Sequence, residues 1–149
     1  MKKINILITG AGSGVGQSVI RSLIYSKIKK YLNLFISDIT IFNPYPIYGL
    51  KYLKIPKVEN KNSKKILKRI IIKNKINIIF IGSEHEIAFF SKNKNFFEKT
   101  NDLKICVSNL KTINLSNDKF KTYEFLKNHN LPHPKTLKIN KNTTFNSVI

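Results

Sequence analysis

The stretch "KINILITGAGSGVGQSVIRSL", residues 3–23, decides the fold. Its first seven residues form a short apolar, β-branched run, which predicts a buried strand. Apolar residues then recur at helical spacing over 14–29, which predicts a helix packed on a sheet. Backbone N–H groups and the positive end of such a helix favour a bound phosphate group. Four glycines lie at this junction: Gly10 and Gly12 between the strand and the helix, and Gly14 and Gly16 in the first turn of the helix.

Strand and helix patterns alternate from residue 3 to residue 108. Further strands are predicted at 33–38, 52–56, 76–82 and 103–108, a loop at 39–49, and further helices at 63–74 and 83–99. Strands joined by helices of this length are normally parallel. The sequence therefore predicts an α/β fold, a Rossmann-like doubly wound parallel sheet, with a ligand crevice at the carboxyl ends of its strands. Those ends are Thr9–Gly16, Asp38, Gly82–Glu86 and Ser108–Asn109.

The pattern changes after residue 110. A helix is predicted over 116–130, with Ser116 or Asn117 as its cap and Asn130 as a left-handed residue that ends it. The prolines of "LPHPKTLKI", residues 131–139, favour an extended chain. The last residues look like the beginning of a second domain. We therefore predict one domain over 1–115, followed by a linker helix and the truncated start of another over 116–149.

Composition narrows the classes of partner. The net charge is +19, but nearly all cations are lysines spread along the chain, and only Arg21 and Arg69 are arginines. Arginine is the residue that most often binds phosphates and the edges of guanine bases. Because this chain has so few arginines, a specific nucleic-acid partner is not expected. A single cysteine, Cys106, excludes an intramolecular disulfide, and no apolar run is long enough to cross a membrane. We expect a cytoplasmic protein with no metal site, since no His, Cys and acidic residues have metal-ligand spacing.

The glycine-rich turn allows two interpretations from the residues alone. A strict dinucleotide fingerprint needs a glycine at 15, where this chain has Val15. The pattern Thr-Gly-x-x-x-Gly-x-Gly, starting at Thr9, is present and resembles the short-chain dehydrogenases. In that scheme Asp38, at the end of the second strand, binds an adenosine ribose hydroxyl. Alternatively, the glycines only allow tight packing of strand and helix.

The short-chain dehydrogenases also use a Tyr-x-x-x-Lys pair, in which the lysine lowers the tyrosine pKa for proton transfer. Tyr25/Lys29 and Tyr123/Lys127 have this spacing, which arises easily by chance in so lysine-rich a chain. The Asn-Asn-Ala-Gly segment of that family is missing, and "GSEHE", residues 82–86, stands in its place.

The "GSEHE" segment follows the clearest strand and begins a helix. The negative charges of Glu84 and Glu86 interact favourably with the positive, N-terminal end of that helix, and Ser83 is placed to cap it. A well-capped helix accounts for these residues without a function. The functional alternative has Ser83 and Glu84 facing the crevice beside the glycine turn, whereas His85 has no orienting partner that would make it a general base.

Three segments in order extend these observations over nearly the whole chain. "ILITGAGSGVGQSVIRSL", "INIIFIGSEHEIAFFSKNKNFFE" and "NDKFKTYEFLKNHNLPHPKT" resemble the start of ATP-grasp ligases. The resemblance is to proteins similar to the carbamoyl-phosphate synthase large subunit and to the pyrrolysine-biosynthesis ligase. In these families a Rossmann-like pre-ATP-grasp domain precedes a helix with an Asp-Lys start, here Asp118-Lys119, and a Pro-x-Pro exit.

The ATP-grasp resemblance implies a ligase that joins a carboxylate to an amine or thiol through an acyl phosphate, with ATP and magnesium as cofactors. The family's ATP- and metal-binding residues lie beyond Ile149, so this chain alone is not expected to be catalytic or to bind ATP tightly. The expected partners are a small-molecule substrate and a separate chain that supplies the ATP-grasp domain. The alternatives are a short-chain dehydrogenase-like NAD(P)-binding domain and a non-enzymatic nucleotide-binding module. Predicted cofactor-binding residues are Gly10, Gly12, Gly14, Gly16 and Asp38, and predicted substrate-binding residues are Gln17, Gly82, Ser83 and Glu84.

Overall fold

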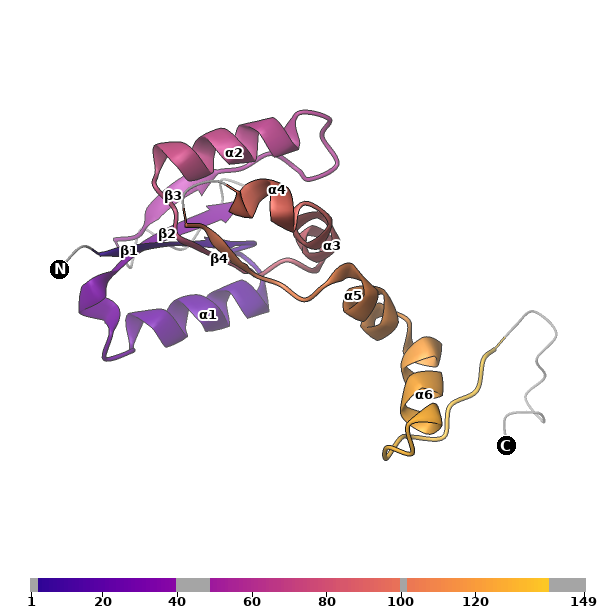
Figure 1. The fold of residues 1–149 in the computed structure, drawn as a ribbon. Coiled ribbons are helices and arrows are strands. Elements are labelled where there is room, and N and C mark those ends of the chain that lie inside the picture. Colours follow the sequence, from indigo (N-terminus) through magenta and orange to yellow (C-terminus); the bar gives the residue numbers. More distant parts are fainter. Residues whose placement is uncertain (1–2, 40–48, 100–101, 140–149) are drawn as a thin grey trace. The chain divides into compact units, whose positions relative to one another are not determined.

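A computed structural model describes residues 3–39, 49–99 and 102–139, in two compact units, Met1–Ser108 and Asn109–Ile149. The first unit holds a sheet in which all five strands are parallel, in the order β3-β2-β1-β4-β5 (Figure 1). This order confirms the predicted α/β fold with a parallel sheet. Most of the predicted loop at 39–49 lies outside the described residues. The strands are β1 (Ile4–Thr9), β2 (Leu32–Asp38), β3 (Lys51–Lys54), β4 (Ile78–Ile81) and β5 (Lys104–Cys106).

Helices cover both faces of the sheet (Figure 1). Ile6 and Ile8 of β1 point toward Ile20 of α1 (Gly14–Ile24), and these residues belong to one buried cluster. Leu7 lies between them in sequence and points to the opposite face, because side chains alternate along a strand. There it joins a second buried cluster with residues of α2 (Ser63–Lys73), α3 (Glu84–Lys92) and α4 (Lys94–Glu98).

Two predicted helices are shorter than expected. Helix α1 ends at Ile24, not at residue 29, and a short 3-10 helix, η1 (Lys29–Tyr31), precedes β2. The predicted helix 83–99 divides into α3 and α4 at Asn93. The Asn93 side chain donates a hydrogen bond to the carbonyl oxygen of Phe89 at 2.8 Å, which competes with the regular helical pattern. Asn93 is therefore the C-cap of α3 and the N-cap of α4.

The described part of the second unit, residues 109–139, contains two helices where one was predicted. Helix α5 (Leu110–Asn117) is capped by Asn109, whose side chain accepts a hydrogen bond from the Thr112 amide. Helix α6 (Lys119–Asn128) is capped by Asp118, not by Ser116 or Asn117. Asn130 has φ 52°, which confirms it as the left-handed residue after the helix. This compact unit begins at Asn109, whereas the predicted boundary followed residue 115; its role as the start of a second domain stays a prediction.

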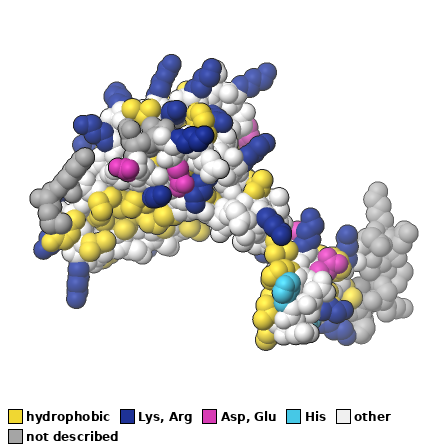
Figure 2. Space-filling view, in the orientation of Figure 1, with side chains coloured by type: hydrophobic (Ala, Val, Ile, Leu, Met, Phe, Trp, Pro, Cys, Tyr) yellow, Lys and Arg dark blue, Asp and Glu magenta, His cyan; other side chains and the backbone are white. Residues whose placement is uncertain are grey.

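Basic side chains are dispersed over the surface. On the face in Figure 2, Lys and Arg side chains project from many places rather than forming one patch. The ammonium groups of Lys64 and Lys68 lie 4.0 Å and 4.7 Å from the centre of the Phe96 ring, as cation–π pairs. Among the described residues, no helix has the length and apolar character needed to cross a bilayer.

Replacement of Asp118 by alanine is expected to fray helix α6. One oxygen of the carboxylate accepts hydrogen bonds from the Lys121 and Phe120 amides, both at 3.0 Å. The Lys121 bond is the largest cause that lowers the pKa of Asp118, so this stabilisation is present above the unfolded-state pKa and is lost as pH falls through the lower folded-state value. We expect faster amide hydrogen exchange in the first turn of α6 in Asp118→Ala, and convergence of the two proteins at strongly acidic pH.

Ser116→Ala is the matched control for Asp118→Ala, because the Ser116 hydroxyl donates to the Ile113 carbonyl and does not cap α6. Equal exchange rates in the two variants would contradict the capping role of Asp118.

Candidate functional site

Three buried glycines lock the first strand, the first helix and the fourth strand together. Gly10 has φ +55°, a left-handed conformation that favours glycine, and a Cβ there would lie 2.6 Å from the Ser83 amide nitrogen. A Cβ on Gly16 would collide with the Gly10 carbonyl oxygen. A Cβ on Gly82 would lie 2.5 Å from the Thr9 carbonyl oxygen and 2.7 Å from the Gly16 Cα. At these three positions the absence of a side chain is a packing requirement.

Gly12 and Gly14 differ from the buried glycines, since both are exposed. A Cβ on Gly14 would meet no atom within 4 Å. A Cβ on Gly12 would lie 2.9 Å from one carboxylate oxygen of Asp38 and meet no backbone atom within 4 Å. The packing alternative therefore accounts for Gly10 and Gly16, whereas Gly12 and Gly14 leave the outer surface of the turn open.

Ser13 fixes the glycine turn to the neighbouring strand. Its hydroxyl donates a hydrogen bond to the Gly82 carbonyl oxygen at 2.6 Å and accepts one from the Gly16 amide at 2.9 Å. The second bond makes Ser13 the N-cap of α1. Because both partners are backbone groups, the start of α1 is held in place without a ligand.

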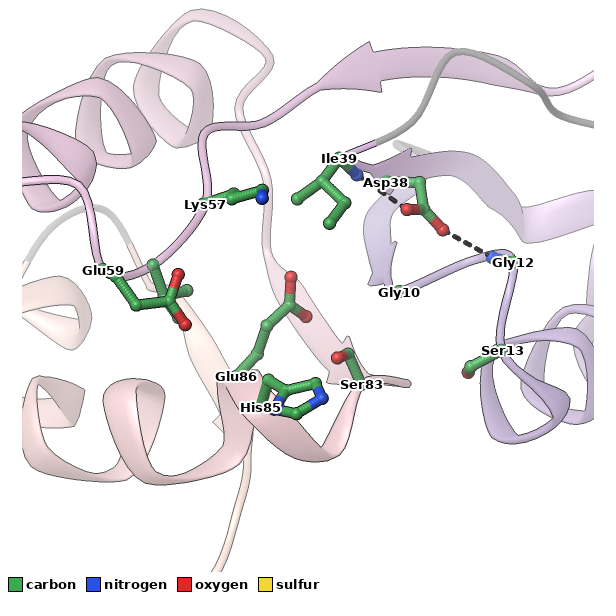
Figure 3. Close-up of a pocket in the computed structure, with 11 residues that line it drawn as sticks. Gly10, Gly12, Ser13, Asp38, Ile39, Lys57, Glu59, Ser83, His85 and Glu86 are labelled. Atoms are coloured by element: carbon green, nitrogen blue, oxygen red, sulfur yellow. Dashed lines mark hydrogen bonds between the residues drawn. The ribbon is translucent and has the colours of Figure 1, made fainter.

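Asp38 joins the end of β2 to the same turn. One carboxylate oxygen accepts a hydrogen bond from the Gly12 amide at 2.7 Å, and the other accepts one from the Ile39 amide at 2.7 Å (Figure 3). The Tyr52 hydroxyl donates to the Asp38 backbone carbonyl at 3.0 Å, and burial together with the Asp38 charge raises the pKa of Tyr52. The carboxylate is thus held beside the glycine turn in a defined orientation.

A pocket of about 660 Å³ opens at this edge of the sheet. Its walls come from the glycine turn, the end of β2, the segment between β3 and α2, and the start of α3 (Figure 3). This volume is within the usual range for small-molecule sites. The lining residues are Gly10, Gly12, Ser13, Asp38, Ile39, Lys57, Val58, Glu59, Ser83, His85 and Glu86.

The structure brings some of the predicted site residues together in this pocket and places others elsewhere. Gly10, Gly12, Asp38 and Ser83 line the pocket, whereas Gly14, Gly16, Gln17, Gly82 and Glu84 do not. The Gln17 side chain donates to the Gly12 carbonyl oxygen at 3.2 Å, on the helix side of the turn. Ser83 is the N-cap residue of α3 without a capping side-chain hydrogen bond. A binding role for each of these residues stays a prediction.

The pocket wall that follows β3 was not predicted from the sequence; it consists of Lys57, Val58 and Glu59. The sequence could have indicated this wall, because these residues follow a predicted parallel strand. The carboxyl end of that strand belongs to the same edge of the sheet as the glycine turn. Glu86 was placed at the predicted ligand edge of the sheet and was expected to favour the start of the helix, but it was not among the predicted binding residues. From the first turn of α3 it lines the pocket.

Glu86 is a buried acid whose side chain has a 5% exposed fraction. Its oxygen Oε2 and the Thr9 hydroxyl oxygen are buried and have no hydrogen-bond partner among the described residues. Burial raises the pKa of Glu86 above its ordinary value, and the charges of Asp38 and Glu59 raise it further, while Thr9 and His85 oppose the shift. The neutral carboxyl group therefore persists at pH values where an exposed glutamate is ionised.

Two further arrangements bear on the chemistry of the chain. Within residues 3–39, 49–99 and 102–139, no three His, Cys, Asp or Glu residues form a group that could hold a metal ion. The two Tyr-x-x-x-Lys pairs lie in different parts of the chain. In the first pair, Tyr25 is 78% exposed at the end of α1. Lys127 lies with its ammonium nitrogen 5.8 Å from the centre of the Tyr123 ring on α6, in the second compact unit.

Comparison with known proteins gives a fold but no family. No family model and no curated protein matches the sequence. The dTDP-glucose 4,6-dehydratase of Bacillus anthracis, solved in complex with NAD, is 17% identical over 68% of this chain and 36% of its own, with a TM-score of 0.50. At this identity the likeness shows a shared Rossmann-like fold, which confirms the predicted fold class.

Two other matched structures have lower TM-scores. The UDP-glucose 4-epimerase of Thermus thermophilus, solved with NAD, is 10% identical over 86% of this chain and 35% of its own, with a TM-score of 0.40. The L-threonine dehydrogenase of Clostridium difficile is 15% identical over 88% of this chain and 35% of its own, with a TM-score of 0.42. The chain spans about a third of the length of these proteins.

The likeness to the dTDP-glucose 4,6-dehydratase corrects the expected relationship to ATP-grasp ligases, which was wrong. That protein is a dehydratase solved in complex with NAD, whereas the expected cofactors were ATP and magnesium. The motifs behind the wrong prediction have local explanations. Asp118-Lys119 is the capped start of α6, and the turn after β1 is one that Rossmann-like folds share.

Proposed function

We propose that this chain is an NAD(H)-binding domain. The observation that carries the proposal is the hydrogen bond between the Asp38 carboxylate and the Gly12 amide, at the pocket that both residues line. In dinucleotide-binding folds an acidic residue at the end of the second strand binds the adenosine ribose, while the glycine turn receives the pyrophosphate. This agrees with the short-chain dehydrogenase alternative derived from the sequence.

The first turn of α1 suits the pyrophosphate group. Helix α1 begins at Gly14, whose surroundings are open where a side chain would stand. The N–H groups at the start of a helix lie outside its repeating hydrogen-bond pattern, and together with the helix dipole they attract an anion. Since Ser13 already holds this turn on β4, binding there would require little rearrangement.

The charge of the pocket suits the adenosine part and favours NAD over NADP. Three of the eight acidic residues of the chain, Asp38, Glu59 and Glu86, line it, in a protein of net charge +19. Carboxylates accept hydrogen bonds from ribose hydroxyls and from the adenine amino group. A 2′-phosphate beside Asp38 would instead meet a like charge, although Lys57 lies on the opposite wall.

Binding of nucleotides to the whole chain tests this proposal. We expect NAD+ to raise the thermal unfolding midpoint in a concentration-dependent way, and NADP+ and ATP to bind at least about tenfold more weakly. The 2′-phosphate of NADP+ would meet the Asp38 charge, and ATP lacks the nicotinamide riboside and brings more negative charge to an acidic pocket. Absence of any NAD+ effect at millimolar concentration, or a clear preference for ATP, would contradict the proposal.

Asp38→Ala is expected to weaken NAD+ binding by roughly 10- to 100-fold, because a hydrogen bond to a charged group contributes about 1.5–3 kcal/mol. The same change removes the repulsion of a 2′-phosphate, so the preference for NAD+ over NADP+ should narrow. Asp38→Asn keeps an acceptor oxygen and is expected to lose less affinity. Isothermal titration of the three proteins with both dinucleotides measures these differences, and an unchanged preference in Asp38→Ala would assign the ribose contact elsewhere.

A further inference from the structure

Glu86 is the innermost of the three acidic residues of the pocket. In Figure 3 its carboxyl group points from α3 into the space between Gly10, Asp38 and Lys57. The groups that face it come from every wall: the Thr9 hydroxyl from β1, Asp38 from β2, Lys57 and Glu59 from the segment after β3, and His85 from α3. It therefore lies between two other carboxyl groups and one ammonium group.

The burial of Glu86 is only partly compensated within the protein, where the Thr9 hydroxyl acts as a hydrogen-bonding neighbour that lowers the pKa of Glu86 against the effect of burial. A buried carboxyl oxygen normally has a hydrogen-bond partner, because an unpaired polar atom loses its bonds to water. Among the described residues, Oε2 of Glu86 makes no hydrogen bond of regular geometry, and its interaction with the Thr9 hydroxyl falls short of one. An unpaired buried polar group that faces a pocket indicates a partner that arrives with a ligand.

The charge state of Glu86 determines which ligand atom can be that partner. An ionised Glu86 could only accept hydrogen bonds and would add a third negative charge to a pocket with Asp38 and Glu59. A protonated Glu86 has an O–H group to donate. A nucleoside offers acceptors for it in the adenine ring nitrogens and the ribose oxygens, and the neutral form avoids repulsion of the pyrophosphate group.

We propose that Glu86 binds the nucleoside of the dinucleotide as a protonated carboxylic acid, donating a hydrogen bond to an acceptor atom of the ligand, so that binding takes up a proton when Glu86 is ionised in the free protein. This inference rests on the proposed function, because it takes NAD as the occupant of the pocket. It adds Glu86 to the residues that bind the dinucleotide, and it couples binding to the uptake of a proton. Binding by the glycine turn and Asp38 alone requires neither.

The experiment is a titration of the whole chain with NAD+ from about pH 5 to about pH 9, in buffers of different ionisation enthalpy. The dissociation constant is expected to rise with pH, by up to about tenfold per unit once Glu86 is ionised in the free protein. In that range the observed heat should depend on the buffer, with a sign that corresponds to proton uptake. Binding of NAD+ without proton uptake at any pH would overturn the inference and leave the proposed function intact.

Two pocket variants assign the proton to a residue. Glu86→Gln keeps the shape and supplies an N–H donor at every pH, so it should bind NAD+ with a flat pH profile and no proton uptake. Imidazole groups also change charge near neutral pH. If Glu86 carries the proton, the NAD+ dissociation constant of His85→Gln should depend on pH as it does in the wild-type chain. If His85 carries the proton, this pH dependence should disappear in His85→Gln, which would overturn the inference.

Glu124→Gln is the control for the loss of one negative charge, because Glu124 is exposed on α6 in the other compact unit. It should match the wild-type chain at each pH. The buffer experiment on the wild-type chain needs no variant, so it decides the inference even if Glu86→Gln does not fold. Absence of NAD+ binding in all four proteins contradicts the proposed function, whereas binding in all four with one common pH profile contradicts only the role of Glu86.

Discussion

Gly82→Ala is expected to lower the free energy of unfolding by about 3 kcal/mol or more, the upper end of the range for an overpacked core. The added methyl group would lie 2.5 Å from the Thr9 carbonyl oxygen, 2.7 Å from the Gly16 Cα and 2.9 Å from the Gly16 nitrogen. All three are backbone atoms of β1 and α1, so no side-chain rotation can relieve the contact. Relief requires α1 to move away from the sheet, which opens the buried cluster around Ile20.

Urea unfolding followed by circular dichroism measures the effect of Gly82→Ala. Gly14→Ala is the matched control, since its methyl group would enter open space and alanine is the better helix former. We expect Gly14→Ala to change stability by no more than about 1 kcal/mol, in the stabilising direction. Similar midpoints for the two variants would show that the junction of β1, α1 and β4 can rearrange, and that glycine is not required at 82.

Gly12→Val is expected to abolish measurable NAD+ binding, a loss of more than about 100-fold, while the fold is kept. The added Cβ would lie 2.9 Å from one carboxylate oxygen of Asp38, which is the far end of a side chain that can rotate. Folding therefore survives, but the Asp38–Gly12 hydrogen bond is disturbed and the valine side chain occupies the face where the pyrophosphate must approach.

Thermal unfolding of Gly12→Val with and without NAD+ separates the two effects. The midpoint without ligand should remain near that of the wild-type chain, and the upward shift with NAD+ should disappear. Ala88→Val is the control, because Ala88 is exposed on α3 and does not line the pocket. If Gly12→Val binds NAD+ normally, Gly12 has no role in NAD+ binding.

Gly82 and Gly12 differ in a way that sequence patterns do not predict, since one is required for packing and the other is exposed. The patterns predicted the parallel sheet and its ligand edge, because the two-residue period of strands and the 3.6-residue period of helices are local properties of the chain. They also placed Asp38 and the glycine turn at that edge. They could not say which glycines are required for packing, since this depends on the atoms that a missing Cβ would meet across β1, α1 and β4.

Local signals also misjudged elements whose ends depend on side-chain hydrogen bonds. The break between α3 and α4 at Asn93 is associated with one side-chain hydrogen bond to the Phe89 carbonyl, which sequence periodicity does not reveal. Helix α5 is short and its apolar residues show only a weak helical period, so it was not predicted. The resemblance to ATP-grasp ligases was wrong for a related reason. A glycine turn, an acidic helix start and a capped helix in sequence satisfy general requirements of Rossmann-like folds, and these requirements do not distinguish one family from another.

The sequence by itself determined an α/β chain with parallel strands and a glycine-rich turn after the first strand, because these features follow from periodicity and from the backbone freedom of glycine. Only the tertiary structure decided that Glu59 and Glu86 join Asp38 in one pocket. These residues come from three elements far apart in the chain, and their separation depends on how α3 and the segment after β3 pack on the sheet. The burial of Glu86, which raises its pKa, is likewise a property of the packed fold.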